Sequence, residues 1–414
     1  MQIRFGTDGI RGPAGSWPLD EDGARGIGAA IARWARVGDE APLVIVGRDT
    51  RESGPALVAA MLEGLSRGGA RALDGGVMPT AAVSCAVEAH GAQAGVVITA
   101  SHNPWRDNGV KVLAPGGGKL LDPDPLEQEL RSPGPDHPGG SIEPLADPLG
   151  PWLASLPRLD LTGLLLLVDA AHGAASQCAP AALESMGARL VRVGCAPDGR
   201  NINDQVGALH PPTELHGAAL GICLDGDGDR LTMLVPGHGP LDGDDLLYLL
   251  DDGGPVVGTV MSNAGLEAAL QGRLIRTPVG DRHVALAMAE HDARVGGEPS
   301  GHLILAGGPP TSCGLYTALA VLARHADAQG RPRLPLPVDG WTRWPQARRN
   351  VAVRAPTVEV EAASQARAAG MRVLVRASGT EALVRVMVEG RDALLVEEAA
   401  DRIAAALRDG PPGS

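Results

Sequence analysis

The chain has 414 residues, of which 44% are hydrophobic and 21% charged, a composition typical of globular domains, and its length predicts two to four of them. Its net charge is −13 and it contains no basic run, so the composition argues against nucleic acid or a membrane surface as partner. The apolar run Leu161–Val168 is far shorter than the roughly 20 residues that span a bilayer.

The number and spacing of the cysteines indicate the cellular compartment in which the chain is expected to work. The five cysteines are scattered and odd in number, and the first residues lack the charged and apolar regions of a signal peptide. Both features favour reduced thiols and a cytoplasmic location.

The first segment, to about residue 152, alternates strand-like and helix-like stretches. Strands are predicted at Leu43–Val46 and Val96–Thr99, and helices at Gly23–Arg36 and Ala56–Gly68. The segment ends in a Pro/Gly-rich stretch, 121–151, which predicts a linker. Alternating strands and helices predict mixed α/β layers.

A Ser-His pair follows one of these strands. The apolar run Ala94–Ile98 leads into Thr99–Pro104, and Pro104 prevents an ordinary strand from continuing, so Ser101 is predicted on a loop at the strand's carboxyl end. Ligands of open α/β sheets bind at this edge. The alternative is a polar turn, since Ser, Asn and Pro are ordinary turn residues.

The second segment, to about residue 252, contains the predicted strand Leu164–Asp169, the predicted helix Cys178–Met186 and an acidic motif, Asp225–Arg230. Three carboxylates at alternate positions can converge on one cation where the intervening glycines let the backbone bend. Hard oxygen ligands favour Mg²⁺ or Ca²⁺. An EF-hand is rejected because its sixth and twelfth positions are Arg230 and Pro236 here. A solvated acidic turn is the remaining alternative to a metal site.

The third segment, about 253–340, carries Gly297–His302 and a predicted helix at Leu315–Ala328. The motif offers a carboxylate, a hydroxyl and an imidazole within six residues, which suits sugar hydroxyls, although taken alone it is weak and a plain loop is the better explanation. In the fourth segment, Arg376–Glu381 lies between two strand-like runs and offers guanidinium, hydroxyl and backbone donors to a dianion. The alternative there is a hairpin with incidental polar residues.

Together these motifs resemble the α-D-phosphohexomutases, and within them the bacterial phosphoglucosamine mutases. The resemblance runs from residue 5 to about 407 and rests on five motifs in family order: Phe5–Gly12, Thr99–Pro104, Asp225–Arg230, Gly297–His302 and Arg376–Glu381. It implies an α/β protein of four domains around a central cleft, three mixed α/β sandwich-like domains and a smaller C-terminal α+β domain. We place their expected boundaries at 1–152 (phosphoserine), 153–252 (metal), 253–340 (sugar) and 341–414 (phosphate).

The resemblance also implies a chemistry. A phosphoserine at Ser101 is expected to give its phosphoryl group to a phosphosugar, and the bisphosphorylated sugar, which also serves as activator, returns its other phosphate. Phosphoryl transfer is mostly positioning and charge neutralisation. Mg²⁺ is expected to be held by the Ser101 phosphate, Asp225, Asp227 and Asp229, with positive charge from Arg11, Lys111 and Arg230. His102 is either a general acid/base or a group that holds the phosphoserine.

The substrate-binding residues implied by the resemblance form two sets. Glu298, Ser300 and His302 are expected to bind sugar hydroxyls, and Arg376, Ser378, Gly379, Thr380 and Arg385 to hold the non-reacting phosphate. A homodimer is left open.

Two departures from the family pattern concern the substrate. Pro299 stands where phosphoglucosamine mutases usually have Asn or Gln, and Cys313 replaces a usual aspartate. The main expectation is interconversion of glucosamine 6-phosphate and glucosamine 1-phosphate. The alternatives are the same chemistry on glucose, mannose or an unusual sugar-like phosphate, and a non-catalytic phosphosugar-binding protein.

Overall fold

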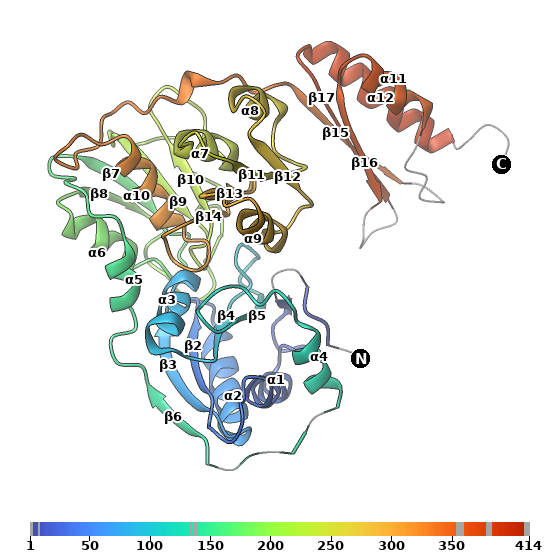
Figure 1. The fold of residues 1–414 in the computed structure, drawn as a ribbon. Helices are drawn as coiled ribbons and strands as arrows, with labels where there is room; N and C mark the ends of the chain where they lie inside the picture. Colours follow the sequence, from blue (N-terminus) through green and yellow to red (C-terminus); the bar gives the residue numbers. More distant parts are fainter. Residues whose placement is uncertain are drawn as a thin grey trace. The chain divides into compact units, whose positions relative to one another are not determined.

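The computed structural model describes residues 3–6, 9–132, 134–135, 137, 139–352, 360–377 and 383–409. It divides into two compact units, Met1–Met261 with Ile275–Pro337, and Ser262–Leu274 with Val338–Ser414. Each unit is described by itself (Figure 1).

The first sheet of the larger unit has the strand order β1-β5-β4-β2-β3-β6. Strands β2, β3, β4 and β6 are parallel to one another. Strand β5 pairs antiparallel with β4, and the edge strand β1 pairs antiparallel with β5. Their bounds are β1 Ile10–Pro13, β2 Leu43–Arg48, β3 Arg71–Val77, β4 Ala94–Ile98, β5 Asp107–Leu113 and β6 Ser141–Pro144.

Helices cover both faces of this sheet. Val44 and Val46 of β2 join one apolar cluster with α1 (Glu21–Trp34), α2 (Gly54–Arg67) and α4 (Asp124–Arg131). The opposite face packs against α3 (Thr80–His90), which in turn contacts α5 (Gly150–Ser155). Because both faces are covered, the central strands are continuous apolar runs, the pattern expected of buried parallel strands.

The predicted linker at 121–151 was wrong. It contains α4, whose Leu126 is fully buried against the first core, and β6, which adds a parallel edge strand beside β3. Pro125 lies in the first turn of α4 and Pro144 is the last residue of β6, positions at which proline does not interrupt an element. Composition alone therefore pointed to a linker where tertiary packing orders the chain.

The second sheet has the order β10-β9-β7-β8, with β7 Leu165–Asp169, β8 Arg189–Val193, β9 Leu220–Leu224 and β10 Leu231–Leu234. Helix α6 (Cys178–Ser185) packs against β8. The acidic motif is the connection between the antiparallel pair β9 and β10, in which Leu224 lies opposite Leu231. The predicted strand and helix of this segment are each confirmed to within one residue.

The third sheet has the order β12-β11-β13-β14, with β11 Val256–Thr259, β12 Leu274–Thr277, β13 Val295–Gly297 and β14 Leu303–Leu305. It packs with α7 (Gly243–Leu250), α9 (Asp281–Glu290) and α10 (Gly314–Arg324). Helix α10 also contacts β9 and β10, so it joins the second and third sheets, and it ends four residues before the predicted helix does.

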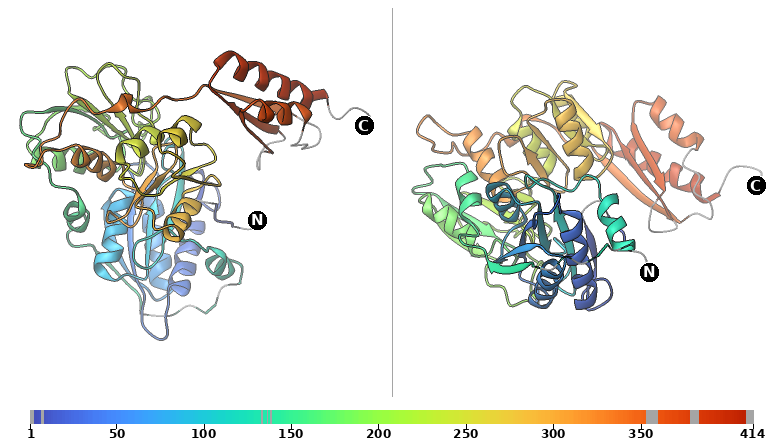
Figure 2. Two further views of the ribbon diagram at one scale, coloured as in Figure 1. Left: turned by 45° about the horizontal axis from the view of Figure 1, so that its top comes forward. Right: turned by 60° about the horizontal axis from the view of Figure 1, so that its bottom comes forward.

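The smaller unit is an antiparallel sheet, β15-β17-β16, packed with α11 and α12 (Figure 2). The bounds are β15 Gln346–Ala352, β16 Arg372–Ala377, β17 Leu383–Glu389, α11 Glu361–Ala368 and α12 Ala393–Asp409; α8 (Ala264–Ala269) and the short 3₁₀ helix Val338–Gly340 also belong to this unit. The three mixed sheets with their helices, and the small C-terminal α+β unit, confirm the predicted fold class.

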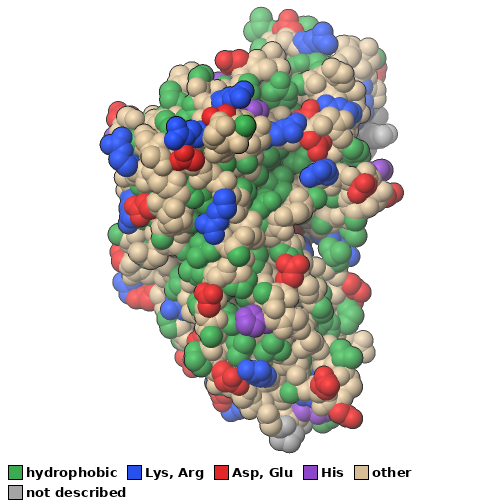
Figure 3. Space-filling view, turned by 60° about the vertical axis from the view of Figure 1, so that its left-hand side comes forward, with side chains coloured by type: hydrophobic (Ala, Val, Ile, Leu, Met, Phe, Trp, Pro, Cys, Tyr) green, Lys and Arg blue, Asp and Glu red, His purple; other side chains and the backbone are tan. Residues whose placement is uncertain are grey.

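The surface is of ordinary mixed character. On the face shown in Figure 3, Lys and Arg side chains are interspersed with Asp and Glu. Over the described part of the chain, every helix is too short or too polar to cross a membrane.

Candidate functional site

Ser101 lies just beyond the carboxyl end of β4, as predicted, and is only 1% exposed. Its Oγ donates a hydrogen bond to Asp225 Oδ2 at 2.7 Å and lies 3.3 Å from Nδ1 of His102. The first sheet thus delivers a serine hydroxyl to a carboxylate that follows a strand of the second sheet.

The backbone at Ser101 is unusual. Its φ is +50°, a left-handed conformation that is strained for a residue other than glycine. The Ser101 N–H donates to Thr99 Oγ1 at 2.9 Å, so the turn is stabilised from within its own motif.

The three aspartates of the acidic motif come together as predicted. Asp225, Asp227 and Asp229 are at most 2% exposed, and one carboxylate oxygen from each lies within 4.8 Å of the others. Gly228 makes this turn possible, because its φ of +74° is accessible to glycine at little cost. Burial and the charges of Asp229 and Asp227 raise the pKa of Asp225 to about 7.

Lys111 and Thr80 approach this cluster from the first domain. Lys111 Nζ donates to Asp227 Oδ2 at 2.7 Å and to Asp229 Oδ2 at 2.6 Å. The Thr80 hydroxyl donates to Asp227 Oδ2 at 2.6 Å. Lys111 is one of only two lysines in the chain, and its ammonium offsets part of the cluster's charge.

The donor set fits a hard divalent cation. Asp227 Oδ1 is buried and accepts no hydrogen bond from any residue that the structure describes. Asp229 Oδ1 has a contact of 3.5 Å with His302 Nδ1. A buried carboxylate oxygen that lacks a donor is destabilising unless a ligand completes it, and three carboxylates are the chemistry that Mg²⁺ accepts.

Arg230 and Arg11 surround the serine with positive charge. Arg230 N donates to Asp225 Oδ1 at 3.1 Å, and its guanidinium lies 4.0 Å from the same carboxylate. Burial, followed by the charges of Arg230 and Arg11, lowers the pKa of His102 to about 4. The imidazole beside Ser101 is therefore neutral at pH 7.

His302 lies beside Asp229 of the aspartate cluster and is 7% exposed. Its Nδ1 is 3.5 Å from Asp229 and its Nε2 is 3.4 Å from Asp281, and Asp281 also pairs with Lys119. Although burial disfavours the cation, the two carboxylates raise the pKa of His302 to about 10. Burial likewise acts against ionised Asp281, but His302 and Lys119 together lower its pKa below the usual range.

This buried pairing predicts an acid-dependent stability. Asp281→Asn is expected to lower the free energy of unfolding at pH 7 by about 3 kcal/mol, since it breaks a largely buried ion pair. The folded-state pKa of Asp281 is below the unfolded value of 3.8, so its contribution is complete above about pH 5 and is lost as the pH falls further. Urea unfolding in EDTA between pH 7 and pH 2.5 should show the difference between wild type and variant beginning to narrow below about pH 5 and narrowing further as the pH falls. A constant difference would contradict this assignment.

The loop at 297–302 lies against the acidic loop that carries the three aspartates. Arg230 and His302 form an isolated bridge, which connects the acidic loop to this one. Glu298 Oε1 accepts from Gly280 N at 2.8 Å, and Ser300 is exposed. Lys111, Asp229, Asp281 and His302 all line a pocket of about 360 Å³.

The two C-terminal arginines lie in the smaller unit. Arg376 and Arg385 are directly opposite each other on β16 and β17, and both are exposed. Like charges opposite one another are destabilising, so this pair favours a nearby anion. Ser378, Gly379 and Thr380 lie outside the described residues.

The two residues that depart from the family pattern, Cys313 and Pro299, lie in different surroundings. Cys313 is 3% exposed, and its sulfur accepts from Trp152 Nε1 and Tyr316 N, both at 3.4 Å, as the N-cap of α10. Its role in the fold is therefore to cap a helix. Pro299 is half-buried in the 297–302 loop, and its carbonyl accepts from Gly243 N at 3.2 Å.

Sequence reasoning missed Asp49, Arg51 and Asn203, which surround the Ser101 turn in the structure. A usable signal was present, because Asp49 and Arg51 directly follow β2, the parallel neighbour of β4. The carboxyl ends of adjacent parallel strands meet at one edge of the sheet.

The fold contains three α/β sheets with their covering helices, and the site combines a buried serine with a buried carboxylate cluster. Together these features define a class of multidomain α/β protein. Profiles of phosphoglucomutase/phosphomannomutase match four parts of the chain: α/β/α domain I at residues 2–132, domain II at 153–238, domain III at 242–333 and the C-terminal domain at 343–406. The chain belongs to the phosphoglucomutase/phosphomannomutase family, the α-D-phosphohexomutases.

Among individual relatives, the chain is similar to phosphoglucosamine mutases. The chain is 39% identical over 437 residues to the phosphoglucosamine mutase of Albidiferax ferrireducens, covering 97% of this chain and 98% of the relative. It is 40% identical over 445 residues to that of Paramagnetospirillum magneticum, covering 98% of each.

Solved structures share the fold. A phosphoglucomutase/phosphomannomutase family protein from Burkholderia thailandensis superposes with a TM-score of 0.80 at 23% identity, covering 100% of this chain and 99% of that one. The N-acetylphosphoglucosamine mutase of Aspergillus fumigatus, in complex with GlcNAc-6P and magnesium, superposes with a TM-score of 0.65 at 16% identity, covering 99% and 96%.

Proposed function

We propose that the chain is a phosphosugar mutase that interconverts glucosamine 6-phosphate and glucosamine 1-phosphate. The observation that carries the chemistry is the buried Ser101 hydroxyl 2.7 Å from Asp225, at the edge of a carboxylate cluster suited to a cation. The substrate is proposed from the near-full-length similarity to phosphoglucosamine mutases. The protein acts in the cytoplasm in this proposal.

Ser101 carries the phosphoryl group. In the forward half-reaction the bond between phosphorus and Ser101 Oγ breaks and a bond forms from phosphorus to the sugar's free hydroxyl oxygen. That oxygen loses its proton and Ser101 Oγ takes one up, so the two oxygens exchange a proton for the phosphoryl group. The product is a bisphosphorylated sugar, which also primes unphosphorylated enzyme. After the sugar turns around, its other phosphate returns to Ser101 by the reverse of these bond changes.

Asp225, Asp227 and Asp229, with the Ser101 phosphate, would hold Mg²⁺. When bound, the ion supplies neutralisation of the charge that develops on the transferring group. Lys111, Arg11 and Arg230 add fixed positive charge around the same oxygens. The protein residues therefore orient a phosphate and offset its charge, which is most of what phosphoryl transfer requires.

His102 is assigned to holding Ser101 rather than to proton donation. Its imidazole lies 3.3 Å from Ser101 Oγ, within hydrogen-bonding distance, and burial lowers its pKa to about 4 while Ser101 carries no phosphoryl group. It remains within hydrogen-bonding reach of Ser101 Oγ, which stays on the serine when the phosphoryl group leaves.

The remaining residues bind the substrate in both orientations. Glu298, Ser300 and His302 bind sugar hydroxyls, and Arg376, Ser378, Gly379, Thr380 and Arg385 hold the phosphate that is not reacting. A permanent phosphate site is needed because one catalytic centre must act on both ends of the sugar.

One observation favours a second substrate. Pro299 lies within the sugar loop, where it removes a backbone donor and an adaptable side chain. Glucose or mannose phosphate, or an unusual sugar-like phosphate, is therefore the alternative. Cys313 adds no support for it, since that side chain is buried as a helix cap.

Initial rates with Mg²⁺ and a bisphosphate primer test the substrate. Glucosamine 6-phosphate is expected to exceed glucose 6-phosphate and mannose 6-phosphate in kcat/KM by about 100-fold, equivalent to about 2.7 kcal/mol in transition-state binding. Equal rates on the three sugars would reject the amino-sugar assignment while retaining the mutase chemistry. Absence of turnover on all of them would reject both.

A further inference from the structure

Arg51 is the most extensively bonded side chain near the proposed phosphoserine. It lies in the connection between β2 and α2, and its side chain is 0% exposed. Its Nε donates to Asp49 Oδ2 at 2.8 Å. The other four donations go to backbone carbonyls of a single turn, those of Ser101, Asn103, Pro104 and Asp107.

All five N–H groups of this guanidinium are therefore used. The terminal nitrogens reach Ser101 O at 2.9 Å, Asn103 O at 2.8 Å and Asp107 O at 2.9 Å. A planar group with five donors in a fixed geometry can satisfy several carbonyls at once, whereas the ammonium of lysine has three donors on one atom. The turn 101–107 is thus shaped around a guanidinium.

The anchor of Arg51 also reaches the serine. Asp49 accepts from Arg51 N at 3.0 Å and from the Thr99 hydroxyl at 2.7 Å, and Thr99 Oγ1 in turn accepts from Ser101 N. The Ser101 backbone is consequently held on both sides, at its N–H through Thr99 and at its carbonyl through Arg51.

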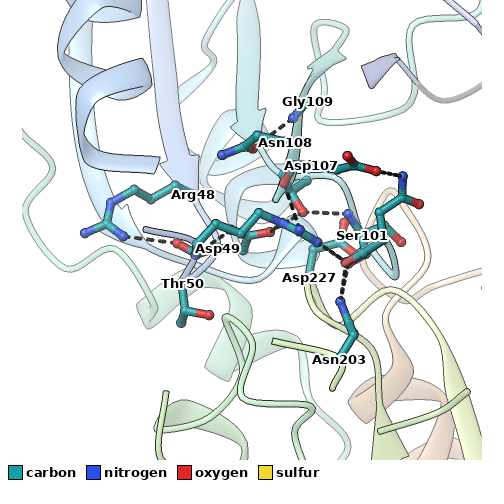
Figure 4. A network of polar contacts seen from close by, with 12 residues as sticks. Arg48, Asp49, Thr50, Ser101, Asp107, Asn108, Gly109, Asn203 and Asp227 are labelled. Carbon is teal, nitrogen blue, oxygen red and sulfur yellow. Dashed lines mark hydrogen bonds and ion pairs between the residues drawn. The ribbon is translucent and has the colours of Figure 1, made fainter. Parts of the chain in front are cut away.

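A second residue holds the same carbonyl from another domain. Asn203 Nδ2 donates to Ser101 O at 2.8 Å and to Asn103 O at 3.1 Å (Figure 4). Gly226 of the acidic loop also lies against this carbonyl, because a Cβ there would come within 2.5 Å of Ser101 O. The Ser101 carbonyl is therefore the point at which the serine turn meets the acidic loop.

These contacts explain how a strained conformation persists. A non-glycine residue at φ +50° is retained only where its surroundings over-determine it. In this geometry Ser101 Oγ reaches Asp225, so the orientation of the hydroxyl depends on the conformation of the backbone that bears it.

We infer that Arg51 is a positioning residue for phosphoryl transfer: its guanidinium holds the 101–107 turn so that Ser101 Oγ is presented to the carboxylate cluster. The inference rests on the proposed function of Ser101. It differs from a purely structural role, in which Arg51 would affect stability but leave the turnover of folded enzyme unchanged.

Arg51→Lys is the first test, measured on protein shown to be folded by circular dichroism. We expect kcat to fall about 100-fold with KM within about threefold of wild type, because a displacement of about 1 Å costs roughly that factor in rate. Formation of phosphoserine from a bisphosphate, followed by intact mass, should slow by a similar factor. The comparison requires that the wild-type protein is an active mutase. If wild type is inactive, the result counts against the proposed function and not against the role of Arg51.

Two further variants separate positioning from folding. Arg51→Ala should regain at least about tenfold in kcat on addition of millimolar guanidinium, whereas Arg33→Ala, which removes another largely buried arginine of the first domain, should show no such rescue. Asn203→Gly removes the second donor to the carbonyl while tolerating the φ of +60° at that position, and kcat should fall about tenfold.

The inference is overturned if folded Arg51→Lys keeps kcat within about threefold of wild type. If neither Arg51 variant folds, Asn203→Gly decides, and unchanged turnover in that variant would likewise overturn it.

Discussion

Ser101→Ala is expected to lower mutase turnover by at least about 10⁴-fold, since the covalent route through a phosphoserine is then closed. The alanine variant should also gain no phosphoryl group when treated with a bisphosphorylated sugar and Mg²⁺, whereas wild type should gain one. Steady-state rates and intact mass measure these two outcomes separately. Substrate affinity is expected to change little, because the sugar and phosphate contacts are made by other residues.

Ser176→Ala is the matched control for this experiment. Ser176 is also a buried serine, but its hydroxyl donates to the Gly173 carbonyl at 2.7 Å rather than to a carboxylate of the acidic cluster. It should keep turnover within a few-fold of wild type. Substantial activity in Ser101→Ala would remove the phosphoserine mechanism and, with it, the role assigned to Arg51.

Asp225→Asn is expected to reduce turnover by about 10³-fold or more, because several kcal/mol of transition-state charge stabilisation depend on the cation that this carboxylate would help to hold. Chelation of wild type with EDTA should produce a comparable loss that Mg²⁺ reverses.

Stability provides a second readout for the same site. Burial and repulsion from the other carboxylates raise the pKa of Asp225, so neutral asparagine should leave the metal-free protein as stable as wild type or more stable. Mg²⁺ at 100 times its dissociation constant should stabilise wild type by about 2.7 kcal/mol and the variant by much less. Thermal unfolding with and without Mg²⁺ measures both effects.

Asp20→Asn controls for the loss of a carboxylate elsewhere. Asp20 caps α1 through a bond from Gly23 N at 2.8 Å, and asparagine is an equally good cap. This variant should retain both activity and the Mg²⁺ response. A full Mg²⁺ response in Asp225→Asn would show that the cation binds elsewhere.

Local pattern was sufficient for most elements of the fold. Apolar runs predicted β4 and β7 because buried strands of a covered sheet are continuously apolar, and helix-like stretches located α1 and α2. The predicted linker failed for the complementary reason. Leu126 and the edge strand β6 become ordered only through α1 and β3, which lie far from them in the chain.

The site residues also fall into two groups, those that the local sequence predicts and those that only the tertiary structure brings together. Asp225, Asp227 and Asp229 are close in sequence, and a glycine-rich turn of five residues is enough to bring them together. Residues whose partners are distant needed the structure: Ser101 meets Asp225 across 124 positions, and Lys111 meets Asp229 across 118.

Motif chemistry thus determined the class of protein, the serine and the cation cluster, because these depend on side-chain type and on contacts over a few residues. Tertiary packing alone decided that Arg51 holds the Ser101 turn, that Asn203 reaches it from the second domain, and that His302 lies between Asp229 and Asp281. Such contacts join loops that are distant in the chain, within the first sheet for Arg51 and between sheets for Asn203 and His302. They form only when the strands and sheets pack, so local periodicity does not predict them.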